Sequence, residues 1–234
     1  MFLMRGRNLY GWCAVKNKIL TEKQQMLIGN LPDEILTNFY LTGGTALSAF
    51  YLEHRLSKDL DFFTDTEQQV PPIEFLTTVI RSLPSVRDTR YERLFDRRIF
   101  EVVFKDSDTL KVEFSTYPFK SIEKRRKIGR LLVDSPLNIV TAKLFALTDR
   151  FEPKDFVDLY FVLDNYDWKL GELVRKTEER FEISGLEYII PERLLLVKKV
   201  GRDDLPVMLK NINAEEMKRY FLRQASELVK AFRT

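Results

Sequence analysis

The sequence predicts an α+β fold, in which a mixed β-sheet with flanking helices is followed by a bundle of helices. Three observations predict it. Short apolar runs alternate with helical patterns in the first part of the chain, two strand-like runs there follow each other around a polar turn, and only helical periodicities recur after Pro136. We therefore expect a sheet-containing part at 1–135 and a helical part at 136–234, with a boundary near Ser135.

Each element of the first part has a local signal. Apolar residues at helical spacing are interrupted at Pro32, which predicts two short helices. Thr45 is expected to cap the helix that follows Gly43 and Gly44, and a later helix follows Pro72. Runs rich in β-branched and aromatic residues predict the strands. In order, the expected elements are helices within 21–36, a strand at 39–41, a helix at 46–54, a strand at 60–63, a helix at 73–83, and strands at 98–104 and 110–115.

The second part contains helical periodicity only. Apolar residues recur there every three or four positions, and proline or a polar residue stands near the start of several segments. The expected helices are 137–150, 154–165, 169–181, 191–199 and 215–232.

Composition limits the class of protein. A chain of 234 residues with 44% apolar residues can bury a core without disulfides. Its 38 basic and 35 acidic residues give a net charge of +3, so nucleic-acid binding would require a local patch. Cys13 is the only cysteine and His54 the only histidine, which excludes an internal disulfide and a Cys/His zinc site. No apolar run is long enough for a membrane span, and the N-terminus makes a poor signal peptide, so we expect a cytoplasmic protein with no membrane partner.

Two signals of phosphate chemistry lie close together at 41–63. Gly43 and Gly44 stand where a strand turns into a helix, and such a turn leaves backbone N–H groups free for a phosphate. Asp59 and Asp61 flank Leu60 on the next expected strand, so both carboxylates lie on one face, about 7 Å apart along the chain. Such oxygen ligands suit Mg²⁺ bound to a polyphosphate.

Each signal alone has a simpler interpretation. Paired glycines often serve only a tight turn, and two acids on a strand are often solvated at a sheet edge. Leu60 and Phe62 place this strand in the core, however, where adjacent carboxylates are unfavourable unless a cation joins them. The combination favours a cation with a phosphate ligand.

A series of motifs resembles the nucleotidyltransferases of the AbiEii toxin type, which include the MenT toxins. These motifs are GGTAL at 43–47, RLSKDLDF at 55–62, KVEF at 111–114, AKL at 142–144, AL at 146–147 with Arg150, and KDFVDL at 154–159. The resemblance implies a polymerase-β-like nucleotidyltransferase fold, with a helical domain at 136–234 that completes the active-site cleft. It also implies NTP and Mg²⁺ (or Mn²⁺) as co-substrate and cofactor, nucleotide transfer, in some relatives to tRNA 3′ ends, and a toxin encoded beside an antitoxin or acting in abortive infection.

The resemblance and the residue chemistry together define the expected site. The expected catalytic residues are Asp59, Asp61, Glu113, Lys143 and Asp155, and the first three of these are the expected metal ligands. The expected NTP-binding residues are Gly43, Gly44, Thr45, Arg55, Ser57 and Arg150.

Several of these roles have a physical basis and an alternative. Glu113 alternates with apolar neighbours, so it faces the cleft as a third metal ligand or as the base for the incoming hydroxyl. Lys143 and Arg150 lie seven apart on one expected helix, where each either neutralises the triphosphate or forms a solvated basic edge. Asp155 either holds one of these cations or caps the next helix. Ser57 either binds a phosphate oxygen or caps a turn.

Two further features lie outside these motifs. The stretch at 120–130 contains six basic residues and one acid, and it is either a solvated face or a place for RNA phosphates with salt-dependent binding. His54 is expected to be structural or on the surface and not a catalyst.

The leading hypothesis is a Mg²⁺-dependent nucleotidyltransferase with RNA as the expected acceptor. Two alternatives stay open: an acceptor hydroxyl on a small molecule or a protein, and an inert relative that only binds nucleotide or a partner. The carboxylate pair argues against the inert protein, because isolated charge in a core is unfavourable without a ligand.

Overall fold

The structure is a computed structural model that describes residues 17–67 and 70–232. Cys13 and the N-terminal segment weighed as a signal peptide lie outside these residues. Within them, no helix combines the length and the apolar character that a membrane crossing requires.

A mixed sheet of seven strands forms the centre of the first part, in the order β3-β4-β5-β2-β1-β7-β6. β2 pairs antiparallel with β1 and parallel with β5, and β1 pairs parallel with β7. The strands are β1 (Tyr40–Thr42), β2 (Leu60–Thr64), β3 (Val86–Leu94), β4 (Arg97–Phe104), β5 (Thr109–Thr116), β6 (Arg126–Ile128) and β7 (Leu131–Val133).

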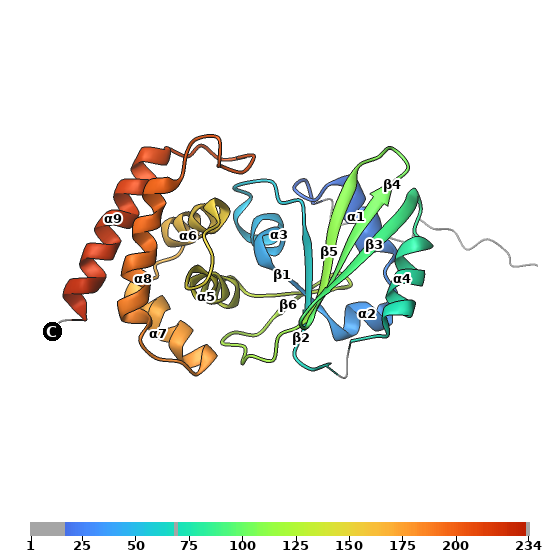
Figure 1. Cartoon of the computed structure of the whole chain (residues 1–234), viewed down its shortest axis with the longest axis horizontal. Coiled ribbons are helices and arrows are strands. Elements are labelled where there is room, and N and C mark those ends of the chain that lie inside the picture. The colour runs from blue at the N-terminus through green and yellow to red at the C-terminus, as the bar shows by residue number, and fades with distance from the viewer. Residues whose placement is uncertain (1–16, 68–69, 233–234) are drawn as a thin grey trace, which may run out of the picture.

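Helices cover both sides of this sheet. Figure 1 shows α1, α2 and α4 on one side and α3 with α5–α9 on the other. The helices are α1 (Glu22–Asn30), α2 (Asp33–Asn38), α3 (Gly43–Leu47), α4 (Ile73–Arg81), α5 (Pro136–Leu147), α6 (Pro153–Asn165), α7 (Leu170–Phe181), α8 (Leu186–Leu194) and α9 (Ala214–Ala231), with a π-helical turn at Ser48–Leu52 and a 3-10 turn at Leu195–Lys199. The α+β class, with a helical region after the sheet, is thus confirmed.

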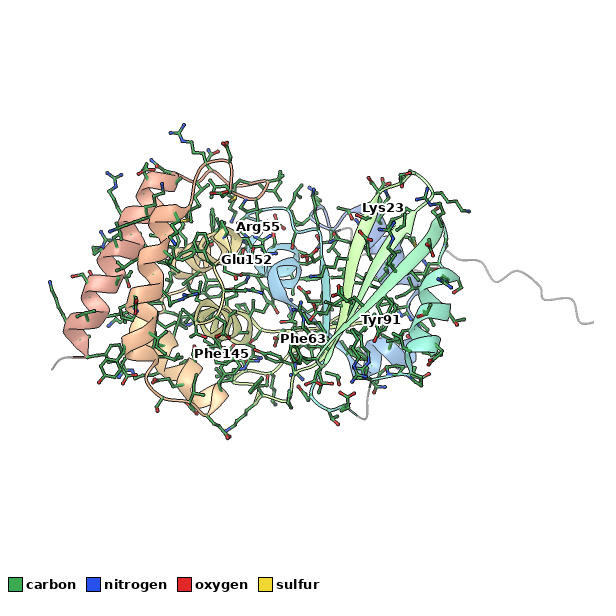
Figure 2. The ribbon with its side chains drawn as sticks, viewed as in Figure 1. Lys23, Arg55, Phe63, Tyr91, Phe145 and Glu152 are labelled. Carbon is green, nitrogen blue, oxygen red and sulfur yellow. The ribbon has the colours of Figure 1, made fainter. Side chains whose placement is uncertain are left out.

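The alternation along β2 separates the core from the site. Leu60 and Phe62 are fully buried on one side of the sheet, whereas the alternating residues Asp61 and Phe63 face the opposite side. The Phe62 ring stacks on that of Phe114 from β5, with centroids 5.3 Å apart. Side chains fill the space between the sheet and the helices on both sides (Figure 2). The face that carries Asp61 is therefore the one available for polar chemistry.

The turn from β1 into α3 differs from the prediction. The helix begins at Gly43, whose φ of 71° turns the chain directly out of the strand, and continues as the π-helical turn to Leu52. Thr45 does not cap it; its hydroxyl donates to the backbone oxygen of Asp59. The predicted helix at 46–54 is therefore present with different bounds, at 43–52. The predicted Thr45 cap is wrong, because the glycine supplies the turn and Thr45 instead holds the segment before β2.

Other differences have local causes. β3 was not predicted because most of its residues are exposed, so it lacks the apolar alternation of a half-buried strand. β6 and β7 were not predicted either, because strands of three residues each are too short to show a periodicity. α5 ends at Leu147, short of the predicted 150, and α8 begins at Leu186 and contains Pro191 within it. Ser135 caps α5 by accepting the N–H of Asn138 at 3.1 Å. The division into two domains at this residue stays a prediction.

The loop before α9 holds the segment between α3 and β2. The Leu56 N–H donates to the Val207 carbonyl and the Leu209 N–H to the His54 carbonyl, each at 2.8 Å. Arg55 and Met208 form an isolated antiparallel bridge. Backbone from the end of the chain thus fixes residues that precede the two aspartates.

Candidate active site

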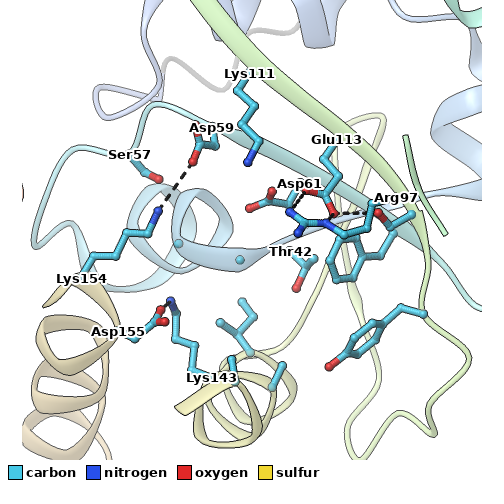
Figure 3. A pocket seen from close by; sticks show the side chains of 18 of the residues that line it. Thr42, Ser57, Asp59, Asp61, Arg97, Lys111, Glu113, Lys143, Lys154 and Asp155 are labelled. Atoms are coloured by element: carbon cyan, nitrogen blue, oxygen red, sulfur yellow. Dashed lines mark hydrogen bonds and ion pairs between the residues drawn. The ribbon is translucent and has the colours of Figure 1, made fainter. Parts of the chain in front are cut away.

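A cleft of about 320 Å³ lies between the open face of β2, β5 and β4 and the helices α5 and α6 (Figure 3). Except for Thr45, all predicted site residues line it. Its charged side chains are the acids Asp59, Asp61, Glu113 and Asp155 and the bases Arg55, Arg97, Lys111, Lys143, Arg150 and Lys154. The cleft therefore combines a cluster of acids with an excess of bases, and the role of each residue stays a prediction.

Two carboxylates on neighbouring strands lie side by side. The parallel register of β2 and β5 pairs Asp61 with Glu113, and Asp59 stands just before β2. Burial, together with the charges of Glu113 and Asp59, raises the pKa of Asp61 to about 6. An ionised Asp61 is therefore unfavourable here until a cation offsets the neighbouring negative charge.

Glu113 already has such a partner. Arg97 from β4 donates to both of its oxygens, with Nε–Oε1 at 2.7 Å and Nη2–Oε2 at 2.6 Å, and the Ser115 hydroxyl donates at 2.7 Å. Burial alone would raise the pKa of Glu113, but the bonds from Arg97 and Ser115 lower it. Glu113 is thus a stably ionised carboxylate that is held by arginine.

The donor set fits a divalent cation at Asp59 and Asp61. Carboxylate oxygens are the ligands that Mg²⁺ prefers, and it commonly takes one or two of them together with substrate phosphates. A Cβ on Gly43 would lie 2.4 Å from Asp61 Oδ2, so the absence of a side chain there leaves the space that this carboxylate uses. Among the described residues, no three His, Cys, Asp or Glu side chains form a ready metal-binding group.

Gly44 allows a similarly close approach by an arginine. A Cβ at this position would lie 2.1 Å from Arg55 Nη2 and 3.4 Å from Ser57 Oγ. We expect Gly44→Ala to lower the free energy of unfolding by about 2 kcal/mol, because Arg55 must leave its buried position. Urea denaturation tests this. Gly171→Ala is the matched control, since its Cβ would meet only Leu228 at 3.5 Å; equal effects of the two substitutions would contradict the prediction.

A buried ion-pair network forms the floor of the cleft. Lys143 Nζ lies 2.6 Å from Asp155 Oδ1 and 2.6 Å from Asp158 Oδ2. Arg55 binds Asp158 with two bonds, Nε–Oδ1 at 2.6 Å and Nη2–Oδ2 at 2.8 Å. Arg150 reaches Asp155 Oδ2 at 2.8 Å. Two buried acids thus hold three basic side chains that line the cleft.

These contacts decide between the two alternatives left open for Asp155, whereas neutralisation of a triphosphate by Lys143 or Arg150 stays a prediction. Asp155 holds both Lys143 and Arg150, and it is not the cap of α6, which begins after Glu152. Lys143 and Arg150 do not share a helix, because α5 ends at Leu147, so the predicted common face is wrong. They come together through Asp155.

The network stays charged at neutral pH. Burial would raise the pKa of Asp158, but Lys143 and Arg55 hold it well below its usual range. Burial would likewise lower the pKa of Lys143, yet Asp158 and Asp155 raise it. Each charge is therefore stabilised by its partners.

His54 is structural. Its side chain is fully buried, its Nε2 lies 2.7 Å from Asp158 Oδ1, and its ring packs against Phe161 with centroids 5.0 Å apart. Burial lowers the pKa of His54, which favours the neutral ring with Nε2–H donating to Asp158. The expectation of a structural histidine holds, and the surface alternative is wrong.

Three charged cleft residues were not among the predicted site residues. Lys111 stands two positions before Glu113 on β5, so strand alternation alone places it on the same face. Lys154 Nζ lies 3.8 Å from Asp59 Oδ2. Arg97 gave no signal, because its position depends on how β4 pairs with β5.

The basic stretch at 120–130 lies apart from the cleft. None of its residues lines the cleft. Arg125 binds Asp65 with two bonds of 2.6 Å and stacks over the Tyr40 ring at 3.5 Å, and Arg130 pairs with Asp33 at 2.7 Å. The remaining basic residues are exposed: Lys120, Lys124, Arg126 and Lys127.

Comparisons with known proteins agree on fold and family. An uncharacterized protein of Aquifex aeolicus (strain VF5) is 28% identical over 214 residues, which are 90% of this chain and 97% of the relative. The crystal structure of JHP933 from Helicobacter pylori has a TM-score of 0.56 at 21% identity and matches 91% of this chain and 94% of that one. A putative nucleotidyltransferase from H. pylori has a TM-score of 0.58 at 21% identity, over 91% and 97% of the two chains.

These solved structures confirm the nucleotidyltransferase-like fold. The model of the family described as nucleotidyl transferase AbiEii toxin, type IV TA system, matches residues 33–233. This match spans the sheet, the cleft and the helices, so the chain belongs to the AbiEii nucleotidyl transferase toxin family.

Proposed function

We propose that this protein transfers a nucleotide from an NTP to an acceptor hydroxyl with the help of Mg²⁺ or Mn²⁺. The observation that carries this proposal is the pair Asp59 and Asp61 at one end of a cleft that six basic side chains also line. A cation bound to a triphosphate presents positive charge to the acids and negative charge to the bases. The cleft offers complementary charge to both.

Different residues of the cleft would bind the cation, bind the triphosphate and stabilise the developing charge. Asp59 and Asp61 would hold the cation, which when bound supplies Lewis-acid stabilisation of the transferred phosphoryl group. Gly43 and Gly44 allow the backbone to approach the triphosphate, and Ser57 offers a hydroxyl donor beside them. Basic side chains that the buried acids hold in place, above all Lys143, would stabilise the charge that develops on the phosphates.

RNA is the acceptor that we propose. The exposed basic residues of 120–130 offer phosphate contacts outside the cleft, and the family resemblance supports an RNA 3′ end. A type IV toxin family also favours an antitoxin partner and a toxic activity for this chain.

The test is to incubate the protein with each labelled NTP, Mg²⁺ or Mn²⁺, and total RNA, protein extract or a metabolite fraction in parallel. We expect label in RNA and a steep fall in transfer as salt rises, because phosphate contacts release counterions. Label in protein or in small molecules instead would overturn the RNA acceptor. No transfer from any NTP to any fraction would overturn the function itself.

A further inference from the structure

Glu113 is the third acid beside the proposed cation site at Asp59 and Asp61, and it is paired with Arg97. In the sheet Asp61 pairs with Glu113, and Arg97 pairs with Ser115 two positions further along the same face. Figure 3 shows the Arg97 guanidinium against the Glu113 carboxylate, beside Asp61. Both Glu113 oxygens accept a bond from this guanidinium, at 2.7 and 2.6 Å. Glu113, which pairs with Asp61 in the sheet, is therefore already bound by a positively charged side chain of the protein, Arg97.

The two partners differ in their freedom to move. The Glu113 side chain is 3% exposed and is also bonded by Ser115, whereas the Arg97 side chain is 42% exposed. A buried carboxylate without a positive partner is strongly unfavourable, and a bidentate arginine is a strong partner. Glu113 thus depends on Arg97, while Arg97 is able to leave toward solvent.

We propose that Arg97 competes with the divalent cation for Glu113, so that the cation site consists of Asp59 and Asp61 alone. Arg97 keeps the third acid neutralised and out of the coordination shell. This inference rests on the proposed function, because it presupposes a cation at the two aspartates. It replaces the expectation that Glu113 is itself a ligand.

Removing the competitor should strengthen cation binding. In Arg97→Gln, Glu113 keeps its carboxyl group but loses its partner, and we expect the dissociation constant for Mn²⁺ to fall by about tenfold in isothermal titration, since a further carboxylate joins the ligand set. The same variant should gain more thermal stability from saturating Mn²⁺ than the wild type does. Both readouts are independent of transferase activity.

Two variants separate ligation from simple charge. Arg90→Gln removes one positive charge from the same face of the sheet, where Arg90 pairs with Glu101 at 2.9 Å, and it should leave Mn²⁺ affinity unchanged. The double variant Arg97→Gln with Glu113→Gln has the net charge of the wild type, and it should bind Mn²⁺ within about twofold of the wild type. It also contains no unpaired buried charge, so it serves if the single variant folds poorly.

The outcomes are distinct. An Arg97→Gln affinity no tighter than that of Arg90→Gln, or a double variant that binds about tenfold more weakly than the wild type, would overturn the competition. In that second case Glu113 would be an ordinary ligand. Wild-type protein that binds no Mn²⁺ would overturn the proposed cation at Asp59 and Asp61, and this inference with it.

Discussion

Asp61→Asn is expected to reduce nucleotide transfer by at least about a thousandfold, which corresponds to roughly 4 kcal/mol of transition-state stabilisation. The amide keeps the size of the carboxylate but carries no charge for a cation. Labelled-NTP transfer measures the loss. Asp167→Asn makes the same change at an exposed position and should keep the wild-type rate. Transfer by Asp61→Asn within tenfold of the wild type would rule out the assigned role.

The same variant should be more stable than the wild type at neutral pH. The pKa of Asp61 in the folded protein is about 6, above the value of 3.8 for an ordinary aspartate. This side chain therefore favours folding at low pH, and that contribution is lost as pH rises from about 4 through 6. The amide of the variant has no charge to acquire over this range. Without added cation, urea denaturation at pH 7 should show a gain of about 3 kcal/mol that disappears near pH 4.

Asp158→Ala is expected to lower the free energy of unfolding by about 3–5 kcal/mol, because Arg55 and Lys143 would keep buried charges without their shared partner. The Asp158 side chain has no exposed surface and is within 2.6 Å of both cations. Urea denaturation measures the loss, which is a large part of the stability of an ordinary domain.

The control for this variant lies on the same helix. Asp164→Ala removes an exposed carboxylate from α6 and should change stability by less than about 0.5 kcal/mol. If Asp158→Ala cost no more than this control, the network would contribute nothing to folding. A second consequence is expected for NTP binding, which should weaken in Asp158→Ala since Arg55 and Lys143 lose their fixed positions.

Local patterns were sufficient to predict the acids on the sheet side of the cleft. Alternation on β2 and β5 puts Asp61 and Glu113 on the polar face, and pairing between these parallel strands then brings them together. Gly43 and Gly44 predicted the turn before α3. Strand alternation and glycine turns can both be recognised from a few neighbouring residues.

The residues that the sequence did not reveal depend on distant partners. Arg55 was expected in the site, but its buried partner Asp158 was not, because Asp158 lies 103 positions further along the chain. Arg97 enters the cleft only through the register of β4 against β5, and the prediction of this strand began one residue too late to include it. β3, an exposed edge strand, has polar residues on both faces and no periodicity to detect.

The contact between the loop at 207–209 and the segment at 54–56 restricts how this chain can be recombined with its relatives. The backbone bonds of Leu56 and Leu209 join the acid-bearing segment to residues near the far end of the chain. A chimera that exchanges everything after Ser135 would replace one partner in these bonds and keep the other. Helices from a relative would therefore function in such a hybrid only if they brought a loop of matching length and course.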